Sequence, residues 1–279
     1  MAKKRPQYIL PGFGFSLGIT LSWLGLVVLI PFAALFIKTV SGGWDHFWET
    51  VLDPRVVASY RLSFGISILA ALINGVFGLL VSWALVRYEF PGRRLMDSLI
   101  DLPFALPTAV AGLSLTAIYA PHGIMGSWLG RYFGVKVAYT RLGVLVALMF
   151  IGLPFVVRTL QPVIADLEDE FEEVAACLGA NRWKTFLRVT FPLLIPSLIT
   201  SITLAFGRAV GEFGSVVFIS GNLPFKTEIT PMLIIIKLDQ YDYTGAAAIG
   251  FVMLMASLGI LLLVNYLQGW QAKRLGRVR

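Results

Sequence analysis

Long uncharged apolar stretches constrain this chain more than any other feature of its sequence. No residue from Phe13 to Ile37 is charged, and the same holds from Leu62 to Val86. A bilayer core is ~30 Å thick and a helix rises ~1.5 Å per residue, so about 20 such residues cross it. Stretches of this kind predict six membrane-spanning helices, at about residues 13–37, 62–86, 102–121, 142–165, 192–221 and 246–267.

Composition supports a polytopic, all-α membrane protein. Hydrophobic residues make up 57% of the chain and charged residues only 14%, which excludes a soluble enzyme. The net charge is +7, but the basic residues are scattered between apolar stretches, so no nucleic-acid partner is expected. Cys177 is the only cysteine, and His46 and His122 are isolated. We therefore expect no disulfide framework, no metal site and no cofactor.

The predicted topology places both chain ends in the cytoplasm. An even number of spans puts the ends on one side, and fourteen of the 23 lysine and arginine residues fall on that side, against eight opposite and Arg208 within a span. Lys3, Lys4 and Arg5 also suit a signal peptide, but the apolar run after them is too long and lacks a small-residue cleavage site. An uncleaved first span is favoured. The stretch 229–236 is too short to cross and predicts a helix at the outer surface.

The segment 166–191, between the fourth and fifth predicted spans, has the pattern of two short helices. It begins with acidic residues, Glu173 among them, and ends with Arg182, Lys184 and Arg188. Acids near an N-terminus and bases near a C-terminus favour a helix. Gly179 lies between the two groups, and glycine adopts backbone conformations closed to other residues. We expect the chain to bend sharply there.

Two interpretations of this segment differ in whether it binds a partner. A solvated loop is the usual meaning of a charged run, but such a loop has little reason to carry large apolar side chains. Small residues allow close backbone approach, and aromatic residues provide anchors for docking. The predicted docking residues are Glu173, Ala175, Ala176, Gly179, Ala180, Trp183, Phe186 and Pro192.

The same residues resemble the EAA motif of ABC importer permeases. Glu173-Val-Ala is followed by Gly179 six positions after the glutamate, and then by Phe191-Pro192. Val174, Val189 and Phe191 replace other apolar residues of the motif. The resemblance implies a type I importer fold in which this segment forms coupling helices on a separate ATPase subunit. The chain has no Gly-x4-Gly-Lys-Ser/Thr loop of its own, so we expect no enzymatic activity in it.

Further motifs narrow the resemblance to the T-type permeases of sulfate/thiosulfate importers. These are residues 87–93, 101–112, 155–163 and 207–214. The 207–214 pattern is also similar to molybdate permeases, so a molybdate or tungstate importer is the alternative. The resemblance implies alternating access in the bacterial inner membrane. The implied partners are a homologous W-type permease, an ATPase homodimer and a periplasmic sulfate-binding protein.

Arg208 and Glu212 are ionisable residues within the fifth predicted span. They are four residues apart and so share a helix face. A lone arginine at the bilayer centre costs about 2.5–3.5 kcal/mol on insertion scales, so such groups pair or face water. The pair is interpreted either as part of an anion path or as an internal ion pair that ties helices together. Both interpretations remain open.

Glycine, proline and hydroxyl residues complete the candidate translocation region. Gly207, Gly211 and Gly214 form a small-residue pattern that predicts close helix packing. Pro103 and Pro107 predict either a gate in the third span or ordinary helix-entry geometry. Hydroxyl side chains either offer weak contacts to an anion or bond the carbonyls of their own helices; these are Ser114, Thr116, Thr200, Ser201, Thr203 and Ser215.

Two other classes of protein fit less well. A secondary transporter or channel acting alone is expected to show internal repeats or several ion ligands at mid-membrane. An intramembrane enzyme is expected to show a zinc motif or a nucleophile elbow, and the sequence has neither.

Overall fold

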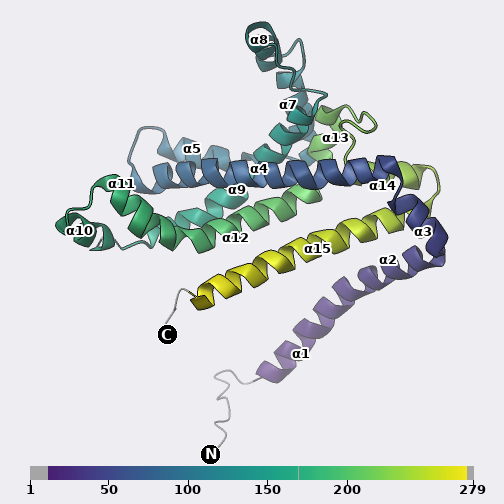
Figure 1. Ribbon diagram of the computed structural model, residues 1–279, viewed down its shortest axis with the longest axis horizontal. Coiled ribbons are helices and arrows are strands. Elements are labelled where there is room, and N and C mark those ends of the chain that lie inside the picture. The colour runs from purple at the N-terminus through teal and green to yellow at the C-terminus, as the bar shows by residue number, and fades with distance from the viewer. Residues whose placement is uncertain (1–11, 169, 275–279) are drawn as a thin grey trace, which may run out of the picture.

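The computed structural model describes residues 12–168 and 170–274, which are almost all helical and contain no β-strand. Figure 1 shows a group of long helices with a separate N-terminal helix and two smaller helical units that project from it. This architecture confirms the predicted all-α class. The described helices, with π-helical segments written η, are α1 (Phe13–Leu24), η1 (Gly25–Leu29), α2 (Ile30–Ser41), α3 (Trp44–Val51), α4 (Pro54–Arg87), α5 (Arg93–Ile100), α6 (Leu102–Ala105), α7 (Thr108–Tyr119), α8 (Ile124–Phe133), α9 (Arg141–Ala165), α10 (Glu170–Cys177), α11 (Arg182–Thr185), η2 (Phe186–Thr190), α12 (Phe191–Val210), α13 (Gly214–Ser220), α14 (Thr230–Asp239) and α15 (Tyr243–Arg274).

Helices α4, α9 and α12 pack against one another and form the centre of the molecule. Glycine allows their close approach: a Cβ atom at Gly78 would lie 2.5 Å from Val156 Cγ1. Polar side chains are satisfied inside this interface, where the amide of buried Asn74 donates to the Met149 carbonyl at 3.1 Å. The helices are therefore joined by small and polar residues as well as by apolar ones.

The segment Phe13–Ser41, which we call the N-terminal arm, is one continuous helix formed by α1, η1 and α2. Its π-helical turn ends two residues before Pro31, whose ring lacks an N–H and crowds the carbonyl four residues earlier, within that turn. The arm leaves the group of helices and runs beside it only near α15 and α3 (Figure 1). None of its most apolar window is buried within the described chain.

Five of the described helices are long and apolar enough to cross a membrane: Phe13–Ser41, Pro54–Arg87, Arg141–Ala165, Arg182–Val210 and Tyr243–Gly269. The structure differs from the sequence prediction at residues 102–121, which form α6 and α7 rather than one helix. Leu106 between them is extended, with φ −88° and ψ 134°, because it precedes Pro107. Helix α7 alone has 12 residues, fewer than a span requires.

The predicted span 192–221 also has different boundaries. Its helix begins earlier, at Arg182, where the Asn181 side chain accepts a hydrogen bond from the Lys184 N–H at 2.9 Å. The helix ends at Val210, and the chain resumes as α13 at Gly214. The basic group Lys3–Arg5, on which the predicted orientation partly rests, lies outside the described residues.

Helix α14, which is predicted at the outer surface, packs one face against α4 and α15 and buries Thr230 and Leu233. Its Leu233 lies in a buried cluster with Val56 of α4 and Ile249 of α15. The apolar run therefore serves as a packing surface, which a stretch of this length does as readily as lying on a membrane.

Candidate functional site

The candidate coupling site is the hairpin formed by α10, α11 and the turn between them (170–185), which lies at one end of the molecule (Figure 1). Gly179 has φ +78°, the left-handed conformation that a glycine adopts without strain. The N–H of Ala180 donates to the Ala175 carbonyl at 3.0 Å, which closes the last turn of α10 in the manner of a Schellman motif. The bend therefore lies at Gly179, as the sequence indicated.

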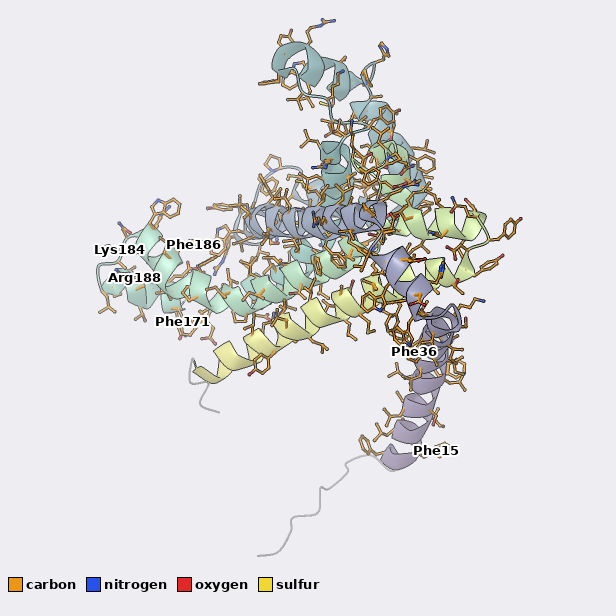
Figure 2. The ribbon with its side chains drawn as sticks, turned by 45° about the vertical axis from the view of Figure 1, so that its right-hand side comes forward. Phe15, Phe36, Phe171, Lys184, Phe186 and Arg188 are labelled. Carbon is orange, nitrogen blue, oxygen red and sulfur yellow. The ribbon has the colours of Figure 1, made fainter. Side chains whose placement is uncertain are left out.

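The predicted docking residues divide into exposed and internal groups. Glu173, Ala176 and Trp183 are exposed, and so are the neighbouring Val174 and Leu178. Figure 2 shows this hairpin, marked by Phe171 and Lys184, far from the N-terminal arm, marked by Phe15. An apolar surface on a projecting hairpin with no cover from the described chain has the character of a docking surface.

Most of the other predicted docking residues are used within the chain. Ala175 is buried, and Ala180 lies half-buried after the bend. The Phe186 ring packs edge-on against Trp83 of α4, with centroids 5.4 Å apart. Pro192 is exposed in the first turn of α12. Ala175 and Phe186 therefore pack within the chain, whereas Pro192 does not.

Glu172 was not singled out from the sequence, yet it connects the hairpin to α4. Its carboxylate lies 3.3 Å from the guanidinium of Arg87 and accepts a hydrogen bond from the Thr190 hydroxyl at 3.4 Å. Glu173, one position later, is directed about 100° further around the helix and is exposed. Their positions around the helix thus direct Glu172 inward and Glu173 outward. The sequence does not show which of the two pairs with Arg87, because Arg87 is 85 residues away.

Arg208 and Glu212 form an ion pair with a nitrogen–oxygen distance of 2.6 Å. They do not share one helix, because α12 ends at Val210. The Glu212 carboxylate is buried and also accepts hydrogen bonds from the N–H and the hydroxyl of Ser215, both at 3.0 Å. Glu212 therefore both neutralises Arg208 and caps the first turn of α13.

The three glycines of this region differ in their surroundings. A Cβ at Gly214 would collide with the Thr108 hydroxyl of α7, whereas Gly211 has no such neighbour within 4 Å and Gly207 only a side-chain atom of Leu261 at 3.9 Å. Gly207 and Gly211 are exposed. Close packing within the chain therefore involves Gly214, and the other two leave an open surface.

The two breaks in the apolar helices lie together. The first turn of α13, at Gly214, contacts the first turn of α7, at Thr108, and Gly112 of α7 faces the Ser215 backbone. Pro107 directly precedes α7, and Pro103 lies in the first turn of α6. Thus two helix starts meet beside the Arg208–Glu212 pair.

Most of the hydroxyl groups considered as anion contacts bond the backbone of their own helices. Thr200 donates to the Pro196 carbonyl at 2.9 Å, and Thr203 to that of Ile199 at 2.7 Å. Thr116 and Ser201 do the same in their helices, and Ser215 bonds Glu212. This is the commoner role of hydroxyls in helices.

A second charged cluster, around Arg158, was also missed by sequence reasoning. The guanidinium donates to both carboxylate oxygens of Asp101, one of them at 2.8 Å, and to Asp97 Oδ1 at 2.7 Å. Hydrogen bonds from the Gln161 amide and from Arg158 hold the pKa of Asp97 below its usual range. The cluster ties α9 to α5 and α6, across more than 55 residues of sequence.

Asp242 organises the corner where the arm meets the body. Its carboxylate bonds Lys237 at 3.0 Å, His46 of α3 at 3.3 Å and the N–H of Gly245 at 2.8 Å. Burial alone raises the pKa of Asp242, but the bonds from Gly245 and Lys237 outweigh it and lower the pKa to about 2. A Cβ at Gly42, at the end of the arm, would lie 2.9 Å from Thr244 Cβ.

Among the described residues, no group of three or more His, Cys, Asp or Glu side chains is placed to hold a metal ion.

Comparisons with known proteins identify the family. A model of the binding-protein-dependent transport system inner membrane component matches residues 74–277. The chain is 47% identical to the sulfate transport system permease protein CysT of Escherichia coli (strain K12), covering 95% of this chain and 96% of that protein. It is 50% identical to CysT of Synechococcus elongatus, covering 95% and 98%.

Among solved structures, the fold is similar to a chain of a bacterial alginate ABC transporter in complex with an alginate pentasaccharide-bound periplasmic protein. The TM-score is 0.76 at 17% identity, over 94% of each chain. This likeness shows the fold, and the motif-based resemblance to importer permeases is confirmed by the relatives. The chain therefore belongs to the binding-protein-dependent transport system inner membrane component family, alongside relatives named sulfate transport system permease protein CysT.

Proposed function

We propose that this chain is the transmembrane subunit of an ATP-driven importer that carries sulfate and thiosulfate across the inner membrane. The observation that carries the proposal is identity of 47–50% with sulfate permeases over 95% of this chain. The matched region includes the long helices, the breaks before α7 and α13, and the α10–α11 hairpin. The ATPase and the delivery of substrate then belong to other subunits.

The α10–α11 hairpin is the proposed contact with an ATPase homodimer. Its support is the exposed face that includes Glu173 and Val174, together with the fixed bend at Gly179. The Glu172–Arg87 and Phe186–Trp83 contacts connect the hairpin to α4. A displacement of the hairpin on ATP binding would then pass to α4 and shift the helices between two access states.

The region of the two helix breaks is the proposed translocation path. Interrupted helices at membrane depth are tolerated where they line a cavity or are covered by protein. Arg208 is only partly buried although its partner Glu212 is fully buried, so one side of the guanidinium is free to face a path completed by a second, W-type permease. The exposed Gly207 and Gly211 are the proposed packing surface for that subunit.

The hairpin end of the molecule is the proposed cytoplasmic side. Helix α15 runs from the α3 corner toward that end (Figure 1). A periplasmic sulfate-binding protein would then deliver the anion at the opposite end.

Uptake by the reconstituted transporter tests the function. Proteoliposomes that contain this chain with the second permease and the ATPase should accumulate labelled sulfate only when ATP is in the vesicle lumen and the binding protein is outside the vesicle. Thiosulfate should compete, and phosphate much less. Uptake of molybdate with no response to sulfate would instead assign the chain to the molybdate-type importers.

The coupling role is tested in the same vesicles. Gly179→Val forces a branched residue into the left-handed region, at a cost of about 1–2 kcal/mol, and should disturb the bend. Glu173→Ala removes the exposed carboxylate. Both should reduce uptake at equal membrane levels, whereas the control Glu49→Ala, exposed on α3 at the other end, should not. Normal uptake by both hairpin variants would contradict the coupling role.

A further inference from the structure

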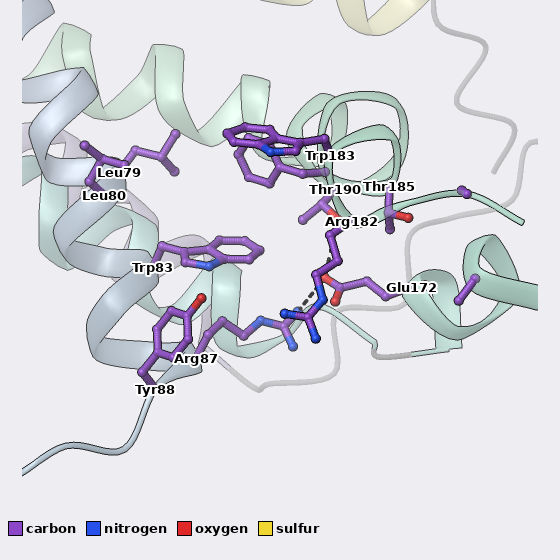
Figure 3. A pocket seen from close by; sticks show the side chains of 13 residues that line it. Leu79, Leu80, Trp83, Arg87, Tyr88, Glu172, Arg182, Trp183, Thr185 and Thr190 are labelled. Atoms are coloured by element: carbon purple, nitrogen blue, oxygen red, sulfur yellow. Dashed lines mark hydrogen bonds and ion pairs between the residues drawn. The ribbon is translucent and has the colours of Figure 1, made fainter.

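A groove lies between the hairpin and the C-terminal turns of α4, beside the Glu172–Arg87 and Phe186–Trp83 contacts that join them. Its volume is about 840 Å³, and its apolar walls include Leu79, Leu80 and Trp83 of α4 and Trp183 and Phe186 across from them. Figure 3 shows the Trp83 and Trp183 rings on opposite sides of this space. One part of the groove is therefore apolar and lies between α4 on one side and α11 with η2 on the other.

The lower part of the groove is basic. Arg87 of α4 and Arg182 of α11 both extend toward Glu172, which pairs with Arg87 (Figure 3). The side chain of Arg182 forms no hydrogen bond or ion pair with the part of the chain that the structure describes. Among the lining residues that the structure describes, the Arg182 guanidinium is therefore the group available to an anionic ligand.

The groove is continuous with a surface that has the properties of a lipid contact. On α4, the turns before the groove expose Val76, Phe77 and Leu80, and Leu80 is 59% exposed. Arg87 and Tyr88 then end the span, and Trp83 lies one turn earlier on the same face as Arg87. Tryptophan and tyrosine gather where a bilayer meets water, and arginine follows at the level of the headgroups.

We propose that this groove binds an anionic phospholipid, with the headgroup phosphate beside Arg182 and an acyl chain along Leu79 and Leu80. A guanidinium matches phosphate with two parallel hydrogen bonds. Basic pockets beside membrane helices bind anionic headgroups in this way. The Arg182 guanidinium favours phosphatidylglycerol or cardiolipin over a zwitterionic lipid. The proposal requires only that the chain lies in a bilayer and is independent of the transported anion.

The test uses the complete transporter in phosphatidylcholine nanodiscs that contain a small share of photo-crosslinkable phosphatidylglycerol, with no substrate present. Crosslinked peptides are mapped by mass spectrometry. Label should appear on the C-terminal turns of α4 and on α11. Arg182→Gln should lower it about fivefold, the effect of one basic residue at an anionic surface. Arg182→Lys should retain most of the label.

Arg188→Gln is the matched control, because Arg188 is exposed on the adjoining turn and does not line the groove. It should leave the label unchanged. Equal labelling of Arg182→Gln and the unmodified chain would overturn the proposal, as would an equal loss with Arg188→Gln. Competition by inorganic phosphate would assign the site to a free anion, and absence of label in the complete transporter would show that the ATPase fills the groove; either result excludes the lipid.

Discussion

The N-terminal arm and α9 are almost equally apolar, yet half of the most apolar window of α9 is buried in the chain and none of the arm's is. They differ in what their residues meet. The buried face of α9 combines small residues such as Gly143 and Gly152 with large ones such as Leu160. The arm also contains glycine, at Gly18, but exposes it together with Trp23. In a bilayer, apolar residues have no reason to leave the lipid, and small residues are what allow helices to meet. Hydropathy therefore identifies a span, but it does not by itself show whether the span packs against protein or lipid.

Buried polar residues also distinguish the packed helices from the arm. On α4, the residues turned toward α9 include Asn74 and Ser82, both buried, and Ser82 donates to the Gly78 carbonyl at 2.6 Å. The described part of the arm places only Thr39 in a buried position. Four changes, from the largest expected effect to the smallest, measure this difference between packed and lipid-exposed helices.

The largest effect is expected from Arg208→Met in the packed region. It leaves the fully buried Glu212 carboxylate without its counter-ion, which should destabilise the protein by about 3 kcal/mol. Arg208→Met with Glu212→Gln should recover most of this loss, because the glutamine oxygen still accepts from Ser215. Arg208→Met with Glu212→Leu should recover less.

Thermal unfolding of the purified chain measures all three variants. If both double variants were as unstable as the single one, the ion pair would not be what holds α12 and α13 together. If they were stable but the reconstituted transporter moved no sulfate, the charges would serve the translocation path.

The next largest loss of stability is expected from a larger side chain at the α4–α9 interface. Gly78→Val places a branched side chain against Val156, where even a Cβ would lie 2.5 Å from the nearest atom, so the α4–α9 interface should open at a cost of about 1–3 kcal/mol or more. The control Gly18→Val, on the arm, meets no atom within 4 Å. Folded yield after membrane extraction compares the two. Equal yields would mean that α4 and α9 approach less closely than their glycines allow.

A smaller, pH-dependent effect is expected at the corner that holds the arm. The pKa of Asp242 is lowered from 3.8 to about 2, so its stabilising contribution is complete above about pH 4 and is lost as the pH falls toward 2. Asp242→Asn should cost at most about 2 kcal/mol near neutral pH and should flatten the dependence of the unfolding temperature on pH in that window. A variant with an unchanged pH profile would show that this corner does not anchor the arm.

The sequence predicted those parts of the fold that depend on local chemistry. The long spans and the bend at Gly179 follow from apolar length and from the conformations of glycine. The break before Pro107 was not predicted, because proline near the start of a helix also fits ordinary helix entry. The end of α12 at Gly211 was not predicted, because glycine is common inside membrane helices and the apolar run continues past it.

Contacts between distant residues were beyond sequence reasoning. Arg158 bonds Asp97 and Asp101 across 61 and 57 positions, and nothing local to Arg158 indicates either partner. The Arg208–Glu212 pair was found because its members are four residues apart. Its interpretation as a shared helix face was wrong, since the helix ends between them.

The smallest effect is expected from Leu29→Ala on the arm. Leu29 is 66% exposed, so its truncation in the isolated chain should cost less than about 0.5 kcal/mol. Leu160→Ala on α9 is the matched change at a fully buried leucine and should cost about 2–5 kcal/mol. Unfolding temperatures are measured for both variants, first in the chain alone and then in the complete transporter. Similar losses for both in the chain alone would remove the distinction between arm and core. A loss for Leu29→Ala that appears only in the complete transporter would mean that the arm packs on another subunit, so that its large side chains meet protein rather than lipid.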